Sequence, residues 1–312
     1  MRSVTRATLA LAAALAGCGN YSTEDLRFLA ALPQREDLHV AVPAQGNPAA
    51  LVGPCTTGTA DVWLRAKPTS DGLNAGVNFV VGLVDVVRRF PPTWRGEDER
   101  GWGPFDDDKH PGRELRIVIV RSHPPALGGA PSYAYAFQAR VKGTPDFTTV
   151  IGGTFDGASA SRGRGGVVLD FEAMWAVGVA NADTPRGVMQ IAYDRVSDPV
   201  TIDLGLTQDG FGVVQFAYGF AGYSDGRGAF DFAFRNAAGD LLTVAASYDA
   251  AGAGRAQTAL TLAAGGSGSF RQCWDGAACL TYVDDPASYS CGAPPCSFGT
   301  TADCPAVPAP PF

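Results

Sequence analysis

Apolar side chains alternate with polar or small ones along most of the chain beyond Trp102. Residues 132–141, 167–172 and 230–234 show the pattern most clearly. Successive side chains of a β-strand point to opposite faces, so a period of two places one face in a core and the other in water. Further runs lie near residues 115–121, 148–155, 188–194, 200–206, 213–220, 241–248, 257–262 and 270–274. The sequence therefore predicts a mainly-β fold of about ten to twelve strands.

Short turn segments separate neighbouring runs. Residues 142–146, 224–226, 238–240 and 252–254 combine glycine with aspartate, proline or alanine. Connections of hairpin length predict an antiparallel meander. An open sheet of this size would leave exposed edges, so we expect it to curl into a full or partial barrel.

Residues 71–90 are the strongest helix candidate, and Pro91 and Pro92 end it. Val77, Val80 and Val84 follow helical spacing, while Phe79 and Leu83 make the other side apolar too. A helix that is apolar nearly all round is buried nearly all round. We therefore predict that this helix packs inside the curled sheet or across its mouth.

This architecture resembles the half-barrel with a helical plug of lipoprotein carriers, and the cup of lipocalins. The resemblance concerns the fold and implies a site for an apolar ligand. The residues that would line such a pocket are Phe79, Leu83, Tyr133, Tyr135, Phe137, Phe230, Phe232 and Phe234. We favour the interpretation that the aromatic rows fill the core, and a pocket for an apolar ligand lined by these residues is the alternative. A transmembrane barrel also alternates, but short runs and the absence of aromatic girdles disfavour it.

The first eighteen residues carry a separate signal. Arg2 and Arg6 precede a short apolar segment, which closes with Leu15-Ala16-Gly17-Cys18. A positive start, an apolar run and small residues before a cleavage point form a secretory signal peptide, too short to span a bilayer. The tetrapeptide resembles the lipobox of bacterial lipoproteins, which are cut before the cysteine and lipidated on it. The resemblance implies a lipid anchor on Cys18.

That anchor makes the membrane a partner and the cell envelope the location. Gly19 follows Cys18 where inner-membrane lipoproteins usually carry aspartate, which favours the outer membrane. Four parts follow: a signal peptide at 1–17, a lipidated N-terminus with short helix and linker at 18–70, the helix and barrel-like domain at 71–290, and a Cys/Pro-rich tail at 291–312. The short helix is expected at 20–32, where Ser22 and Asp25 have the spacing of a capping box.

Besides Cys18, the cysteines are Cys55, Cys273, Cys279, Cys291, Cys296 and Cys304. An even number in an exported protein predicts three disulfides, although the sequence does not specify their pairing. Nearness in sequence favours Cys273 with Cys279, and Cys291 with Cys296 or Cys304, which leaves Cys55 to join the C-terminal tail. No C-x-x-C motif occurs, and His39, His110 and His123 are distant from the cysteines, so we expect no metal.

Three other motifs suggest chemistry. Residues 222–226 match G-x-S-x-G around Ser224, but a strand-like run follows and no histidine lies downstream, so a hairpin loop is favoured over a hydrolase. Asp170 and Glu172 would share one strand face, whereas glycosidase pairs flank a sugar-binding cleft. The acidic segments 97–99 and 106–108 lack calcium-loop spacing and are interpreted as a solvated loop.

The net charge of −7, with no cluster of basic residues, disfavours nucleic-acid binding. We expect a lipid-anchored envelope protein with a structural or binding role, no enzymatic activity and no cofactor. Its partners would be the membrane and either an apolar ligand or another envelope protein. The first alternative is a carrier of a lipid-like ligand, and the second is a hydrolase that uses Ser224.

Overall fold

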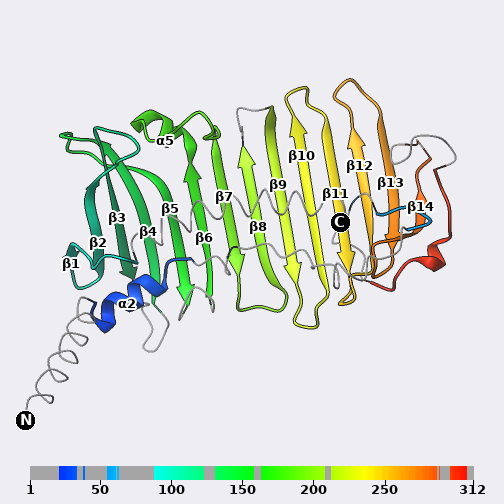
Figure 1. The fold of residues 1–312 in the computed structure, drawn as a ribbon, viewed down its shortest axis with the longest axis horizontal. Helices are drawn as coiled ribbons and strands as arrows, with labels where there is room; N and C mark the ends of the chain where they lie inside the picture. The colour runs from blue at the N-terminus through cyan, green and yellow to red at the C-terminus, as the bar shows by residue number, and fades with distance from the viewer. Residues whose placement is uncertain are drawn as a thin grey trace, which may run out of the picture.

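The computed structural model describes residues 21–33, 38, 55–60, 62, 88–122, 131–157, 163–207, 212–286, 288 and 296–307. In this part of the chain, fourteen strands form one antiparallel sheet whose spatial order follows the sequence (Figure 1). The strands are β1 Trp94–Arg95, β2 Glu99–Asp106, β3 Arg113–Ser122, β4 Ser132–Val141, β5 Thr148–Gly157, β6 Gly163–Asp170, β7 Val188–Asp194, β8 Val200–Thr207, β9 Val213–Gly222, β10 Gly228–Asn236, β11 Leu241–Tyr248, β12 Gly254–Thr261, β13 Ser267–Trp274 and β14 Leu280–Asp284.

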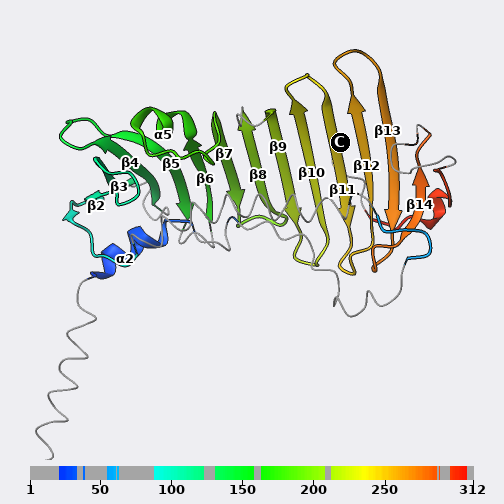
Figure 2. The ribbon, with the colours of Figure 1, turned by 45° about the horizontal axis from the view of Figure 1, so that its top comes forward.

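The predicted antiparallel meander is confirmed, and the curled sheet remains open. Figure 2 shows one continuous layer with β2 and β14 towards its opposite ends. The predicted runs correspond to β3 through β13, while β1, β2 and β14 were not predicted. The acidic loop prediction is wrong in part, because β2 runs between the two acidic segments and its Trp102 is completely buried.

Strand β6 ends earlier than the alternation suggests. Helix α5, Phe171–Val177, begins directly after Asp170, whose carboxylate accepts a hydrogen bond from the Ala173 N–H at 2.8 Å. Glu172 lies in the first turn of that helix and accepts a hydrogen bond from the Gly187 N–H at 2.9 Å. The prediction that Asp170 and Glu172 share a strand face is therefore wrong, because an aspartate N-cap starts a helix there.

Helix α2, Thr23–Ala30, confirms the predicted short helix and its capping box. Ser22 and Asp25 hydrogen-bond each other's backbone N–H groups. The helix packs against the β2–β4 end of the sheet, where the Phe28 ring meets the Tyr133 ring edge-on at a centroid distance of 5.6 Å. Of the predicted helix at 71–90, residues 71–87 lie outside the described residues. No helix among the described residues is long and apolar enough to cross a membrane.

A buried ion cluster fixes α2 to the sheet. The Asp25 side chain is completely buried and accepts hydrogen bonds from Arg100 at 2.7 Å and Arg95 at 3.1 Å. Burial opposes ionisation of Asp25, but the Ser22 N–H and the two guanidinium groups outweigh it and lower its pKa to about 2. Arg121 forms a second ion pair, with Glu24, so two acidic residues of one helical turn hold the helix in place.

Two disulfides fasten the opposite end of the sheet. Cys55 is bonded to Cys279, at the turn before β14, and Cys273 of β13 is bonded to Cys304 of the tail. Cys296 is also disulfide-bonded. The predicted Cys273–Cys279 pair is wrong, because the strand register places Tyr282 opposite Cys273. Of the two partners predicted for Cys291, Cys304 is wrong because it is bonded to Cys273. The prediction that Cys55 joins the tail is also wrong, because its partner is Cys279.

Aromatic side chains lie over glycines on the core face. Directly paired examples are Tyr135 with Gly153, Tyr193 with Gly165, Tyr248 with Gly228 and Trp274 with Gly254. A Cβ atom built on Gly153 would lie 2.2 Å from the Tyr135 ring, so the ring occupies the space that a side chain would need. These pairs fix the strand register, since a slip would drive a ring into a side chain.

Candidate functional site

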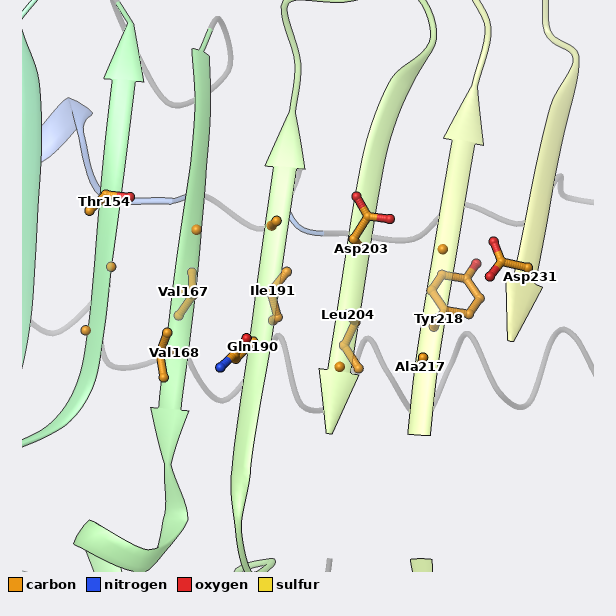
Figure 3. Close-up of a pocket in the computed structure, with 16 residues that line it drawn as sticks. Thr154, Val167, Val168, Gln190, Ile191, Asp203, Leu204, Ala217, Tyr218 and Asp231 are labelled. Carbon is orange, nitrogen blue, oxygen red and sulfur yellow. The ribbon is translucent and has the colours of Figure 1, made fainter. Parts of the chain in front are cut away.

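A groove of about 630 Å³ lies on the centre of the sheet (Figure 3). Its lining comes from six consecutive strands, β5 through β10, and from no other described element. Every wall of the groove is therefore part of one sheet. A site of this form is an open trough rather than an enclosed chamber.

The groove opens on the face opposite to the core. Ile191, Leu204 and Tyr218 are at most 5% exposed, so their side chains point into the core and only their backbone borders the groove. The alternating residues face outward. Six of these are glycine or alanine and form a low floor: Gly152, Gly166, Ala192, Gly205, Ala217 and Gly219. The larger outward residues are Thr154, Val168, Gln190, Asp203 and Asp231.

Two carboxylates flank a glycine at one end of this floor. Gly219 pairs with Asp203 on one side and with Asp231 on the other. A Cβ atom built on Gly219 would lie 2.4 Å from Asp231 Oδ1, so the Asp231 carboxylate leans over Gly219. Figure 3 shows Asp231 directed towards β9 and Asp203 on the neighbouring strand beyond it. The glycine thus leaves room for both acidic groups to approach one space.

The negative charges of Asp203 and Asp231 are not balanced by a positively charged side chain of the groove. Burial, and then the charge of Asp203, raise the pKa of the Asp231 carboxyl. Neither aspartate has a hydrogen bond or ion pair with any other described residue, and no lysine or arginine lines the groove. The groove therefore presents negative charge that this part of the chain does not neutralise.

The aromatic residues that were candidates for a ligand pocket lie away from the groove, and most of them fill the core as the favoured interpretation predicts. Tyr133, Tyr135, Phe137, Phe230 and Phe232 are buried in the hydrophobic core. Phe234 is half-buried, and none of these six lines the groove. Phe79 and Leu83 lie outside the described residues, as does the predicted lipidation site Cys18.

Ser224 lies in the hairpin between β9 and β10, outside the groove. Its hydroxyl donates a hydrogen bond to Asp198 at 2.5 Å, and its N–H donates to the same carboxylate at 3.1 Å. The G-x-S-x-G segment thus joins two strands, whereas a nucleophile elbow joins a strand to a helix. Within the described part of the chain, no three His, Cys, Asp or Glu residues are grouped to hold a metal ion.

Sequence reasoning missed the groove because its floor is made of single small residues contributed by six different strands. The only signal was the repeated placement of glycine and alanine at outward positions, which becomes a surface once the register is known. No protein-family model, curated protein or solved structure matches the chain. Function is therefore inferred from the chain's own residues.

Proposed function

We propose that this chain is a lipid-anchored protein of the cell envelope with a non-enzymatic binding role, exercised through the outward face of its sheet. The groove on that face is the observation that carries the binding role. The lipobox-like segment at Cys18 supports the anchor. The two disulfides support an oxidising compartment such as the periplasm or the cell surface.

The shape of the groove favours a binding surface over a carrier cavity. A carrier encloses most of an apolar ligand, typically in a pocket of about 300–1,000 Å³ with apolar and aromatic walls. The groove has such a volume, but it is open on one side and includes two carboxylates. The aromatic side chains that would suit an apolar ligand are packed in the core instead. A partner that lies across the sheet fits this arrangement better than an engulfed lipid.

Replacing Cys18 with serine tests the anchor. We expect the parent protein to fractionate with membranes and Cys18→Ser to appear in the soluble fraction or to keep its leader. Lipid attachment explains this result, because several acyl chains at about 0.8 kcal/mol per methylene hold a folded domain on a bilayer. The readouts are membrane fractionation and mass spectrometry of the N-terminal peptide, which should carry the acyl groups on Cys18.

Asn20→Ser is the matched control, since it changes a neighbouring residue and keeps Cys18. It should remain membrane-bound and acylated. A processed Cys18→Ser protein that still fractionates with membranes would show that the attachment has another cause.

A further inference from the structure

We propose that the groove binds an extended polypeptide segment and holds one of its lysine or arginine side chains between Asp203 and Asp231. The inference deepens the binding role proposed above and rests on it. Three observations support it: the charge of the groove, the position of Gly219, and the one-sided shape of the trough.

Charge complementarity selects a cationic group. Asp203 and Asp231 lie on either side of Gly219, and the described chain supplies no cation to them. Two unneutralised carboxylates repel each other, and Asp231 is also partly buried, which makes its charge harder to maintain. An ammonium or guanidinium group placed between them removes both penalties and gains charge-assisted hydrogen bonds.

The absence of a side chain at Gly219 lets the Asp231 carboxylate lean towards Asp203. The Asp231 carboxylate already occupies the volume of a Cβ atom at that position. The carboxylate therefore leans across the glycine towards Asp203, and a single cation above the pair contacts both acids. A side chain at position 219 would displace the Asp231 carboxylate from this position.

The shape selects an extended chain. Six adjacent strands at about 4.8 Å spacing give a trough of roughly 24 Å, which corresponds to about seven residues of extended polypeptide. Thr154 and Gln190 contribute hydrogen-bonding groups towards the β5–β7 end, and Asp203 and Asp231 lie towards the β8–β10 end. A divalent cation fits less well, because calcium takes six to eight oxygen ligands and the described groove offers two carboxylates.

The test uses the mature chain, purified from membranes in detergent, and a fluorescein-labelled peptide of four Ala-Lys repeats. Fluorescence anisotropy should show saturable binding to the parent protein and none for a peptide of four Ala-Glu repeats. The Asp203→Asn/Asp231→Asn protein should bind the lysine peptide at least about tenfold more weakly, since it loses both charge-assisted hydrogen bonds to the lysine. Asp146→Asn removes an exposed carboxylate outside the groove and should bind like the parent.

Thermal unfolding of the single variant Asp231→Asn separates loss of binding from loss of folding. The raised pKa means that folding takes up protons near that pKa, so the ionised carboxylate destabilises the folded state as pH rises through it. Asp231→Asn should therefore unfold at the same temperature as the parent or higher at pH 7, while it binds the peptide more weakly.

Three results would overturn the proposal. The double variant could bind the lysine peptide as tightly as Asp146→Asn does, which would assign the attraction to the protein's net charge. Spermidine could compete at concentrations equal to those of the peptide, which would assign the site to small amines. Calcium alone could displace the peptide, which would assign it to a metal. All groove variants keep Cys18, so membrane fractionation tests the anchor independently of peptide binding.

Discussion

Asp25→Ala should lower the free energy of unfolding by about 3–5 kcal/mol, the range seen when one partner of a buried ion pair is removed. The substitution leaves the guanidinium of Arg100, with a side chain only 7% exposed, without its carboxylate. It also removes half of the capping box that begins α2. Urea unfolding at pH 7, followed by circular dichroism, measures the loss.

The pH dependence gives the same prediction a second readout. The folded-state pKa of Asp25, about 2, lies below its ordinary value of 3.8, so its contribution is present above about pH 4 and is lost as pH falls towards 2. The stability difference between parent and Asp25→Ala should therefore shrink between pH 4 and pH 2. Asp108→Ala, at an exposed position, should change stability by no more than about 0.5 kcal/mol. Equal effects of the two substitutions would show that the buried cluster does not hold α2.

Gly153→Ala should destabilise the protein by about 1–3 kcal/mol or more, whereas Gly152→Ala, one residue away, should be tolerated. A Cβ atom at Gly153 would lie 2.2 Å from the Tyr135 ring and 2.4 Å from the Gly166 carbonyl oxygen. The carbonyl belongs to the adjacent strand, so neither neighbour yields without loss of pairing or of the Tyr135–Gly166 hydrogen bond.

The neighbouring glycine provides the matched control. A Cβ atom at Gly152 meets nothing closer than 3.5 Å, an ordinary contact distance, and points to the opposite face. Replacing a strand glycine with alanine at such an open site removes chain entropy from the unfolded state and is neutral or stabilising. Comparison of the two unfolding midpoints decides the matter, and similar midpoints would mean that Tyr135 does not pack over Gly153.

Alternation and turn composition were enough to predict the class and topology of the fold. The alternate spacing of side chains such as Phe230 and Phe232 is enough to predict a buried strand face. The capping box of Ser22 and Asp25 is likewise a local sequence signal, for the start of a helix. The end of β6 was missed because Phe171 continues the apolar alternation. The helix there is decided by the capping hydrogen bond of Asp170, which the period of hydrophobicity does not reveal.

Features that depend on register were less accessible. Cys273 and Cys279 are close in sequence, yet the pairing of β13 with β14 directs them to different partners. The Asp203–Gly219–Asp231 row joins residues from three strands, so it cannot be predicted from the sequence of any one segment. Predicting that row requires the alignment of β8, β9 and β10, which the cross-strand packing of the whole sheet determines.

The Cys55–Cys279 bond, with 224 residues between its cysteines, has a consequence for how the protein matures. Each strand from β2 onward pairs with the strand that precedes it in the sequence, so the sheet itself is built from contacts between neighbouring segments of the chain. The disulfide of Cys55, by contrast, cannot form until Cys279, near the C-terminal end of the chain, has been synthesised. A chain that ends before Cys279 therefore keeps Cys55 without its native partner, and that unpaired sulfur distinguishes such truncated molecules from complete ones.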